Sequence, residues 1–450
     1  MAKTKVVHAC NECGTPHPKW AGQCSGCGAW NTLIEEIAAA PDVAGEGSSR
    51  TPSAPVQIGD IDTQIGRPQP TGIGELDRVL GGGIVPGSVT LLGGEPGIGK
   101  STLLLQLLAW WPATTLYVSA EESAQQVRLR AERLGAVRPD LWLLAETSVP
   151  DIVAAIDEVR PALVVVDSIQ AVADPVLGSP PGSVVQVRAC AHRLVVEAKR
   201  RGIPVVIVGH VTKDGGLAGP RVLEHVVDTV LSFEGDRHHA LRLLRASKHR
   251  FGPTDELGLF EMATGGLVGV PDASRLFLAD RRIGVPGSAV APTIEGKRPI
   301  VVEVQALTAA APYDVPVRRT SQGVDGGRLA LLLAVLQQRA CQPVGNADVY
   351  VSTVGGVRLV EPGLDLAVCM AVVSALTGQP LPADLAVFGE VGLGGELRHV
   401  GHTRRRLSEA SRLGFTRVIA PKNSPAPDGD SIRMIRVGTL PEALAAAGLT

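Results

Sequence analysis

Residues 94–101 read Gly-Glu-Pro-Gly-Ile-Gly-Lys-Ser, the spacing of a phosphate-binding loop. The glycines let backbone N–H groups face a β-phosphate, and a helix that begins at the loop adds positive potential. In this pattern Lys100 reaches the β- and γ-phosphates, and the hydroxyl of Ser101 coordinates Mg²⁺. The sequence therefore predicts an ATPase whose nucleotide site includes Gly94, Glu95, Pro96, Gly97, Ile98, Gly99, Lys100, Ser101 and Thr102.

Two carboxylates follow apolar runs beyond this loop, and their positions suit the same reaction. Leu163-Val-Val-Val runs directly into Asp167, and a strand that ends in Asp places a carboxylate beside the magnesium in such folds. Tyr117-Val-Ser-Ala leads into Glu121, which we predict to polarise the attacking water. Glu122 is the second candidate for that role, although the helix dipole alone also favours an acid at the start of a helix.

A further apolar run, Val205–Gly209, ends in the polar sequence His210-Val-Thr-Lys213. A polar residue at the end of such a strand can sense the γ-phosphate, and we assign that role to His210 or Lys213. The glycine-rich stretch Asp214–Pro220 follows, and we expect it to move when the nucleotide changes.

Four cysteines form two close pairs, Cys10 with Cys13 and Cys24 with Cys27. Each Cys-x-x-Cys makes a tight knuckle that directs two sulfurs at one point, and four thiolates suit a closed, tetrahedral Zn²⁺ site. A segment of about 30 residues buries too little surface to fold alone, so the metal would supply its folding energy. We therefore predict a structural zinc finger in residues 1–36, with His8 and His17 as surface residues.

The composition bounds the class of protein. A chain of 450 residues suggests two or three domains, and with only 3% aromatic residues their cores must be aliphatic. The net charge of −2 gives the whole chain no basic attraction to nucleic acid, so a nucleic-acid site would be a local surface. No apolar run is long enough to span a bilayer, and the N-terminus lacks the apolar stretch of a signal peptide. Paired cysteines of this kind indicate a reducing compartment, and we expect a cytoplasmic protein with no membrane partner.

The elements that position these residues can be recognised from the spacing of apolar runs. From about residue 60 to about residue 275, short β-branched runs alternate with helix-length stretches, which is typical of βαβ units and a parallel sheet. Residues 37–57 are rich in Ala, Pro, Gly and Ser and are predicted to form a flexible linker. The sequence thus predicts an α/β core that follows the cysteine-rich segment.

Several segments together resemble the bacterial RadA (Sms) family of DNA repair proteins over nearly the full chain. They are Thr71–Val89, the phosphate loop, Tyr117–Ser123, Gly209–Lys213, Leu223–Asp228 and Lys248–Gly252. The resemblance implies a RecA-like parallel-sheet ATPase core over residues 58–285, related in design to DnaB-type replicative helicases. It also identifies the N-terminal segment as the zinc ribbon of that family.

The segment Lys248–Gly252 departs from the family signature at one position. The family has Lys-Asn-Arg-Phe-Gly, and here His249 stands in place of Asn. Taken alone, Lys248 and Arg250 would be typical of a solvated turn. In this kind of ring enzyme, however, the signature lies at the subunit boundary, so the resemblance implies that both cations are catalytic and stabilise transition-state charge at the neighbour's nucleotide.

The C-terminal region, residues 286–450, resembles the Lon protease domain, which implies an α+β fold. A Lon-type protease uses a Ser nucleophile activated by a Lys. Against that pattern the Ser position falls at about Gly363 and the Lys position at about Arg406. Gly supplies no nucleophile and Arg stays protonated, so we expect an inactive protease domain that acts as a scaffold. Its basic residues could contact DNA phosphates or form a solvated helix face; they are Arg398, Arg404, Arg405 and Arg406.

The resemblance implies a DNA-dependent ATPase that forms a ring. Its expected role is helicase or translocase activity in branch migration of recombination intermediates, with single-stranded and branched DNA, a RecA recombinase and further copies of itself in a hexameric ring as partners. Two alternatives are a nucleotide-regulated switch resembling circadian-clock ATPases and, disfavoured by Gly363 and Arg406, an ATP-dependent protease. Translocation polarity and the partner of the zinc finger are not encoded in these motifs.

Overall fold

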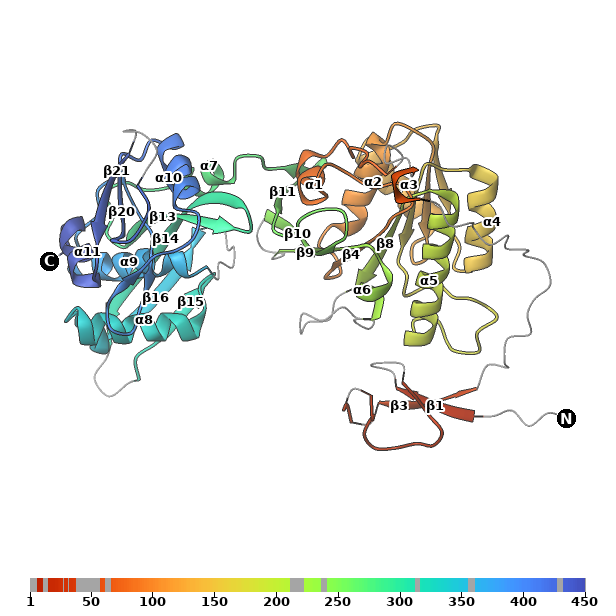
Figure 1. Ribbon diagram of the computed structural model, residues 1–450, viewed down its shortest axis with the longest axis horizontal. Helices are drawn as coiled ribbons and strands as arrows, with labels where there is room; N and C mark the ends of the chain where they lie inside the picture. Colours follow the sequence, from red (N-terminus) through yellow and green to blue (C-terminus); the bar gives the residue numbers. More distant parts are fainter. Residues whose placement is uncertain are drawn as a thin grey trace. The chain divides into compact units, whose positions relative to one another are not determined.

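The computed structural model describes residues 6–10, 15–26, 28–30, 32–37, 57–60, 66–210, 222–235, 241–311, 316–354, 361–426 and 432–449. The chain divides into two compact units, Met1–Gly269 and Val270–Thr450 (Figure 1). Among the helices of the described residues, none combines the length and apolarity that a membrane-spanning segment needs.

The N-terminal part of the first unit contains a three-stranded antiparallel sheet in the order β2-β1-β3. Its strands are β1 (Val6–Cys10), β2 (Pro16–His17) and β3 (Leu33–Ile37). Cys10 and Cys24 are buried together with Leu33 in a small apolar cluster. Most of the predicted linker lies outside the described residues.

The main part of the first unit is a nine-stranded sheet in the order β12-β11-β10-β9-β4-β8-β7-β5-β6. Its strands are β4 (Val89–Gly94), β5 (Thr115–Ser119), β6 (Leu141–Leu144), β7 (Leu163–Asp167), β8 (Val205–His210), β9 (Thr229–Glu234), β10 (Leu241–His249), β11 (Leu257–Ala263) and β12 (Gly266–Gly269). The strands from β9 through β4, β8, β7 and β5 to β6 pair in parallel, which confirms the predicted core. The antiparallel extension from β9 to β12 was not predicted.

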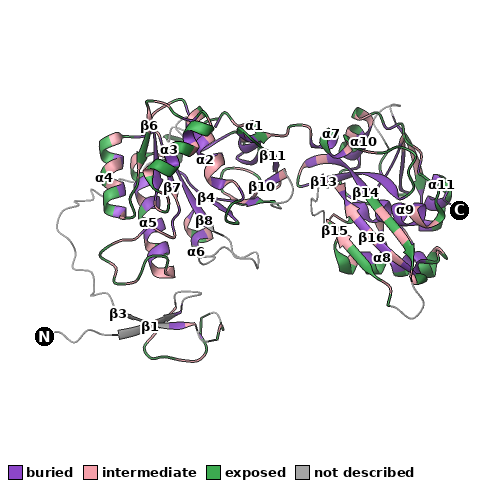
Figure 2. Ribbon diagram, turned by 180° about the vertical axis from the view of Figure 1, so that it is seen from behind, coloured by how far each residue is buried: buried purple, intermediate pink, exposed green. Residues whose placement is uncertain are grey.

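Helices cover both faces of this sheet. They are α1 (Gly74–Val79), α2 (Lys100–Trp110), α3 (Ala124–Arg133), α4 (Val149–Val159), α5 (Val184–Arg201) and α6 (Val222–Val226), and a short, exposed 3₁₀ helix, η1 (Ile58–Asp60), precedes them in the chain. Because successive side chains of a strand point to opposite faces, Leu92 of β4 packs in the core that contains α2, whereas Leu91 packs in the core that contains α4 and α5. Figure 2 shows these strands buried between helices whose outer faces are exposed.

The second unit is built on a four-stranded sheet in the order β13-β14-β16-β15 and a three-stranded sheet in the order β17-β20-β21. Its strands are β13 (Ser288–Glu295), β14 (Arg298–Ala310), β15 (Arg319–Gln322), β16 (Ala347–Thr353), β17 (Leu385–Val387), β18 (Glu390–Val391), β19 (Leu397–Arg398), β20 (Arg417–Pro421) and β21 (Arg433–Val437). Its helices are α7 (Ala273–Leu278), α8 (Gly326–Arg339), η2 (Val344–Asn346), η4 (Pro362–Leu364), α9 (Asp365–Thr377), α10 (Thr403–Arg412) and α11 (Leu440–Ala447). The helix α9 is apolar on all sides and packs on β13 and β14, as a central core helix does.

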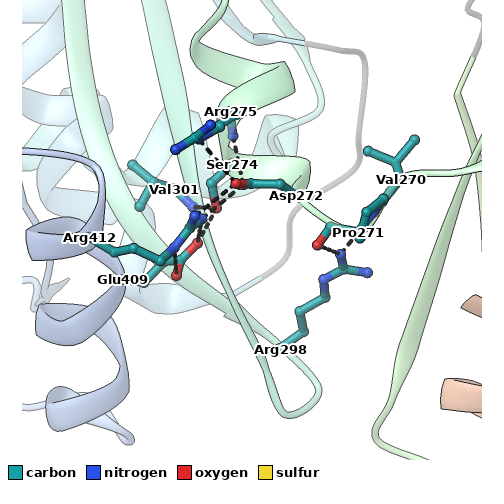
Figure 3. A network of polar contacts seen from close by, with 9 residues as sticks. All are labelled: Val270, Pro271, Asp272, Ser274, Arg275, Arg298, Val301, Glu409 and Arg412. Atoms are coloured by element: carbon teal, nitrogen blue, oxygen red, sulfur yellow. Dashed lines mark hydrogen bonds and ion pairs between the residues drawn. The ribbon is translucent and has the colours of Figure 1, made fainter. Parts of the chain in front are cut away.

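Residues 270–285, which the sequence analysis assigned to the ATPase domain, belong to the second compact unit. A polar network fixes the start of this segment (Figure 3). Arg298 donates to the main-chain carbonyls of the segment's first two residues at 2.9 and 2.8 Å. Asp272 caps α7 and accepts two hydrogen bonds from Arg412 at 2.7 and 2.8 Å. These contacts tie the start of the segment to the second unit, so the division falls earlier in the chain than the boundary at residue 285 that the resemblance implied.

Candidate nucleotide site

The predicted phosphate loop lies between β4, which ends at Gly94, and α2, which begins at Lys100. Gly99 has a φ of 114°, in the left-handed region that a side chain would strain. A Cβ added at Gly94 would lie 2.5 Å from the carbonyl oxygen of Phe233, so only glycine fits beside β9. The strand, the glycine loop and the helix therefore have the arrangement that the motif requires.

Lys100 is 5% exposed and lies inside the loop. Its Nζ donates to the carbonyl oxygens of Gly94 and Glu95 at 2.8 and 2.9 Å. Burial lowers the pKa of Lys100, while the nearby carboxylates of Asp167 and Glu121 act in the opposite direction. The ammonium group is thus held by main-chain carbonyls that an incoming phosphate could replace.

Asp167 lies at the end of β7 and reaches the phosphate loop. The Ser101 hydroxyl donates to Oδ2 of Asp167 at 2.6 Å, so the two residues predicted to bind Mg²⁺ lie together. The hydroxyl of Tyr117 donates to the same oxygen at 2.7 Å. Burial and the neighbouring carboxylate of Asp167 raise the pKa of Tyr117. Sequence reasoning missed Tyr117, whose only signal is a single aromatic hydroxyl in the short buried strand Thr115–Ser119.

The two candidate bases differ in their partners. Both carboxylate oxygens of Glu122 accept hydrogen bonds from Arg130, at 2.8 and 2.7 Å. The carboxylate of Glu121 accepts a hydrogen bond from the Ser168 hydroxyl. Because Arg130 occupies both carboxylate oxygens of Glu122, the geometry favours Glu121 as the residue that receives a proton from water.

These side chains surround a cavity of about 350 Å³. Its lining residues are Pro96, Gly97, Gly99, Lys100, Ser101, Thr102, Ser119, Glu121, Glu122, Arg130, Arg133 and Asp167. The loop and the three acids were named from the sequence, whereas Arg130 and Arg133 of α3 were not. The cavity combines cations, hydroxyls and carboxylates as a site for a metal–polyphosphate complex would.

Arg242 is a second residue that sequence reasoning missed. It is 5% exposed, and its Nε donates to the carbonyl oxygen of Ile98, within the phosphate loop, at 3.1 Å. A lone Arg in the apolar run Leu241-Arg-Leu-Leu was the signal that could have found it. The strand β10 therefore supports the loop from a position 144 residues away in sequence.

Lys248 and Arg250 lie at the other edge of the sheet from the phosphate loop. His249 pairs with Thr229 of β9, and Thr229 pairs with Thr90 at the amino end of β4. The loop follows the carboxyl end of β4, so roughly 13 Å of strand separates the two levels. The structure therefore does not bring these two cations to the phosphate loop of their own chain.

Local contacts hold both cations at that edge. Lys248 Nζ donates to the carbonyls of Glu224 and Val227 at 2.5 and 2.7 Å, and burial, then the nearby Arg250, lowers its pKa. Arg250 lies 3.6 Å from Asp228, and its side chain is 52% exposed. An exposed guanidinium supported by a buried carboxylate can extend toward a neighbouring molecule.

His249 anchors this segment. Its ring nitrogens lie 2.9 Å from the Thr229 hydroxyl and 3.2 Å from the Leu80 carbonyl oxygen. Burial lowers its pKa, and the bond to the Leu80 carbonyl opposes that shift. The residue that replaces the family Asn thus has a defined packing role between β9 and the end of α1.

The predicted γ-phosphate sensor lies only partly within the described residues. The backbone of His210 pairs with that of Gly94, so β8 ends beside the start of the phosphate loop. Lys213 and the loop Asp214–Pro220 lie outside the described residues.

The predicted zinc finger is also described in part. Cys10 and Cys24 are 1% and 2% exposed, whereas Cys13 and Cys27 lie outside the described residues. The Gly26 N–H donates to Cys24 Sγ at 3.3 Å, and His17 Nε2 lies 3.6 Å from the same sulfur. Two buried thiols in one cluster, one of them bonded by a nearby main-chain N–H, fit the donor set of a structural zinc site.

In the second unit, the two positions aligned with the protease dyad are adjacent. A Cβ added at Gly363 would lie 3.0 Å from Arg406 Nη1 and 2.6 Å from a carboxylate oxygen of Glu361. Arg406 is 1% exposed and donates to Glu361 through both terminal nitrogens, at 2.9 and 2.7 Å. An ion pair between the buried Arg406 and the partly buried Glu361 therefore lies where a protease would have its nucleophile and base.

This burial corrects one expectation about the basic run. Arg406 cannot offer its guanidinium to DNA, because α10 turns it inward with Thr403, Leu407 and Ala410. Arg404 and Arg405 are exposed on the outer face, where Arg405 donates to the Lys297 carbonyl at 3.1 Å. Arg398 pairs with Glu396 at 2.6 Å.

Three family models match the chain. They are an AAA domain over residues 55–216, a rubredoxin metal binding domain over residues 8–35, and the C-terminal proteolytic domain of Lon protease (S16) over residues 346–432. With the observed sheet, they confirm the predicted ATPase core, zinc ribbon and Lon-protease-like fold.

Curated relatives match along nearly the whole chain. The DNA repair protein RadA of Bacillus subtilis is 48% identical over 456 residues, which cover 99% of both proteins. RadA of Pseudomonas aeruginosa is 49% identical over 449 residues, again with 99% of both covered. RadA of Streptococcus pyogenes is 47% identical over 432 residues and 94% of both. A solved KaiC-like protein from Pyrococcus horikoshii aligns with 46% of the chain at 18% identity and a TM-score of 0.38, too weakly to support an argument.

Proposed function

This chain belongs to the RadA family of DNA repair proteins, and from that premise we propose that it is a DNA-dependent ATPase acting as a ring-shaped helicase or translocase. Its role would be to promote branch migration of recombination intermediates in homologous recombination and repair. Single-stranded and branched DNA and a RecA recombinase would be its partners, in the cytoplasm.

One observation carries the proposal of a shared site. Lys248 and Arg250 lie at the amino end of β4, whereas the phosphate loop lies at its carboxyl end. Phosphoryl transfer needs cations that neutralise charge as it develops, and these two cannot supply it to their own loop. A neighbouring copy would bring the two edges together, which supports a closed ring, for which we propose six subunits.

In this proposal, residues of two neighbouring subunits together form one ATPase site. Lys100 holds the β- and γ-phosphates, and Glu121 takes the proton of the attacking water. Lys248 and Arg250 of a neighbouring copy stabilise charge on the transferring phosphoryl group. Mg²⁺, when bound at Ser101 and Asp167, neutralises phosphate charge. His210 or Lys213 would report the state of the γ-phosphate.

The other parts of the chain support this motor in the proposal. A ring channel binds a strand mainly through its phosphates, so sequence preference would be low and salt dependence strong. Zn²⁺ held by Cys10, Cys13, Cys24 and Cys27 would stabilise the N-terminal finger. The Lon-protease-like domain would serve as a ring scaffold without protease activity.

The test is the rate of ATP hydrolysis with and without single-stranded DNA, followed by a branch-migration assay. We expect DNA to stimulate hydrolysis. A hydrolysis rate that is the same with and without DNA would instead favour a nucleotide-regulated switch. Mixing Lys100→Ala with Arg250→Ala subunits should restore part of the activity, because mixed rings contain some boundaries with both residues intact. No rescue in rings shown to co-assemble would contradict the shared site.

The protease alternative has a separate test. Casein degradation in the presence of ATP should be absent, because Arg406 is paired with Glu361 and position 363 is Gly. Degradation that survives removal of trace proteases would restore that alternative.

A further inference from the structure

Tyr117 occupies a position for which neither the motif nor the proposed roles account. It lies on β5, next to β7, and is 2% exposed. Its ring packs in the apolar core that also contains α2, while its hydroxyl reaches Asp167 at 2.7 Å. A buried tyrosine hydroxyl requires a partner, but here the partner is the carboxylate proposed to orient the metal.

Two hydroxyls define the orientation of that carboxylate. Ser101 and Tyr117 both donate to Oδ2 of Asp167, at 2.6 and 2.7 Å. Within the part of the chain that the structure describes, no side-chain hydrogen bond reaches Oδ1, and Asp167 lines the cavity. Hydrogen bonds from O–H to a carboxylate are short and directional, so the pair fixes which oxygen faces the cavity.

Two cations, Arg130 and Lys100, act on the electrostatics around Asp167. Arg130 is close enough for Tyr117 and Asp167 to raise its pKa, after the larger effects of burial and of its bond to Glu122. Lys100 is also near enough to Asp167 for that carboxylate to raise the lysine's pKa against the larger effect of burial. The carboxylate is therefore within the electrostatic reach of two cations. Ser101 must also serve the metal, so Tyr117 is the donor to Asp167 that has no second task.

We infer that Tyr117 is a positioning residue of the magnesium site: its hydroxyl holds Oδ2 of Asp167 so that the other carboxylate oxygen faces the metal and its water ligands. The inference rests on the proposed Mg²⁺–ATP site. Partners of metal ligands fix ligand orientation, and their loss typically costs about 10-fold to 100-fold in metal affinity or activity.

The experiment compares the full-length wild type with Tyr117→Phe, which removes only the hydroxyl. The control is Tyr350→Phe, which removes a tyrosine hydroxyl from β16 of the second unit. Binding of a fluorescent, non-hydrolysable ATP analogue is measured first in EDTA and then across a Mg²⁺ titration. Mn²⁺ bound per nucleotide is counted by electron paramagnetic resonance.

For Tyr117→Phe we expect nucleotide affinity in EDTA to change by less than about two-fold, while the Mg²⁺ concentration for half-maximal enhancement rises about 10-fold or more. Tyr350→Phe should match the wild type in both measurements. Normalising bound Mn²⁺ to nucleotide sites counted in EDTA corrects for any variant that fails to fold.

Three results would overturn the inference. An unchanged Mg²⁺ requirement would reduce Tyr117 to a core residue, and loss of binding in EDTA would mean that its hydroxyl supports the fold rather than the metal. If the nucleotide affinity of the wild type did not change with Mg²⁺, the proposed metal site itself would be contradicted, and the role of Tyr117 with it.

Discussion

Each of the two units buries a cation beside acidic residues, but the two arrangements differ in what remains available. In the first unit, Lys100 donates to main-chain carbonyls, and its neighbouring acids line a cavity of about 350 Å³. In the second unit, Arg406 donates four hydrogen bonds, to Gly401, Pro292 and twice to Glu361. The first arrangement leaves room for a ligand, whereas the second satisfies the cation within the protein.

The comparison shows that a buried cation can either bind a ligand or stabilise the fold. A buried ion pair contributes little net stability over an apolar pair, but breaking it exposes an uncompensated charge to a low dielectric. Arg406 and Glu361 therefore maintain the fold where a nucleophile and a base would otherwise react. Lys100 is less firmly satisfied, which suits a group that must bind phosphate. Substitutions in the two units should separate these roles.

The largest effect is expected at Lys100. Lys100→Ala removes the cation that faces the phosphates, and ATP hydrolysis should fall by about a thousand-fold or more, the scale of losing a charge-stabilising group in phosphoryl transfer. Phosphate release measures the rate. The control Lys422→Ala changes an exposed lysine of the second unit and should hydrolyse ATP like the wild type. Substantial hydrolysis by Lys100→Ala would remove the distinction between the units.

The second effect is on folding. Arg406→Ala leaves Glu361 without its bidentate partner, and the free energy of unfolding of the second unit should fall by about 3–5 kcal/mol. Denaturant unfolding measures it, and hydrolysis per folded molecule should stay near the wild-type rate. Arg398→Ala breaks a pair whose Arg side chain is 59% exposed, and should cost less than about 1 kcal/mol. Equal costs in the two variants would contradict a structural role for the buried pair.

Restoring the nucleophile is expected to fail. In Gly363→Ser, the new Cβ would lie 2.6 Å from a Glu361 oxygen, so the variant should lose about 1–3 kcal/mol of stability through overpacking. It should not gain protease activity, because Arg406 remains protonated and paired. Gly401→Ser is the control, since a Cβ there has no atom within 4 Å. Casein cleavage by Gly363→Ser alone would show that the dyad position is still competent.

Much of the first unit could be predicted because its chemistry is local in sequence. The phosphate loop is one continuous motif, and Asp167 ends a recognisable apolar strand. Tyr117 and Arg242 were missed because their roles depend on atoms 50 and 144 residues away. The antiparallel strands β9–β12 also escaped prediction, since apolar runs show that a strand exists but not which neighbour it pairs with.

The second unit shows a different limit. Alignment to the Lon pattern put Gly363 and Arg406 at paired positions, and the structure places them side by side. The run of three arginines suggested exposure of all three. The helical spacing of Thr403, Arg406 and Ala410 was a signal for burial, because residues three or four apart share a helix face. The charge of Arg406 argued against burial, because the sequence does not show that Glu361 lies opposite and compensates that charge.

The smallest expected effect is on pH dependence and belongs to the first unit. Burial lowers the pKa of His249 in the folded chain, whereas a histidine in the unfolded chain has a pKa of about 6.5. Below that pH the unfolded chain binds the proton more readily, so stability should fall as the pH drops from about 6.5. His249→Asn, the family residue, should flatten this slope in thermal melts, and His192→Asn, at an exposed histidine, should not. A slope that His249→Asn leaves unchanged would assign the acid sensitivity to other groups.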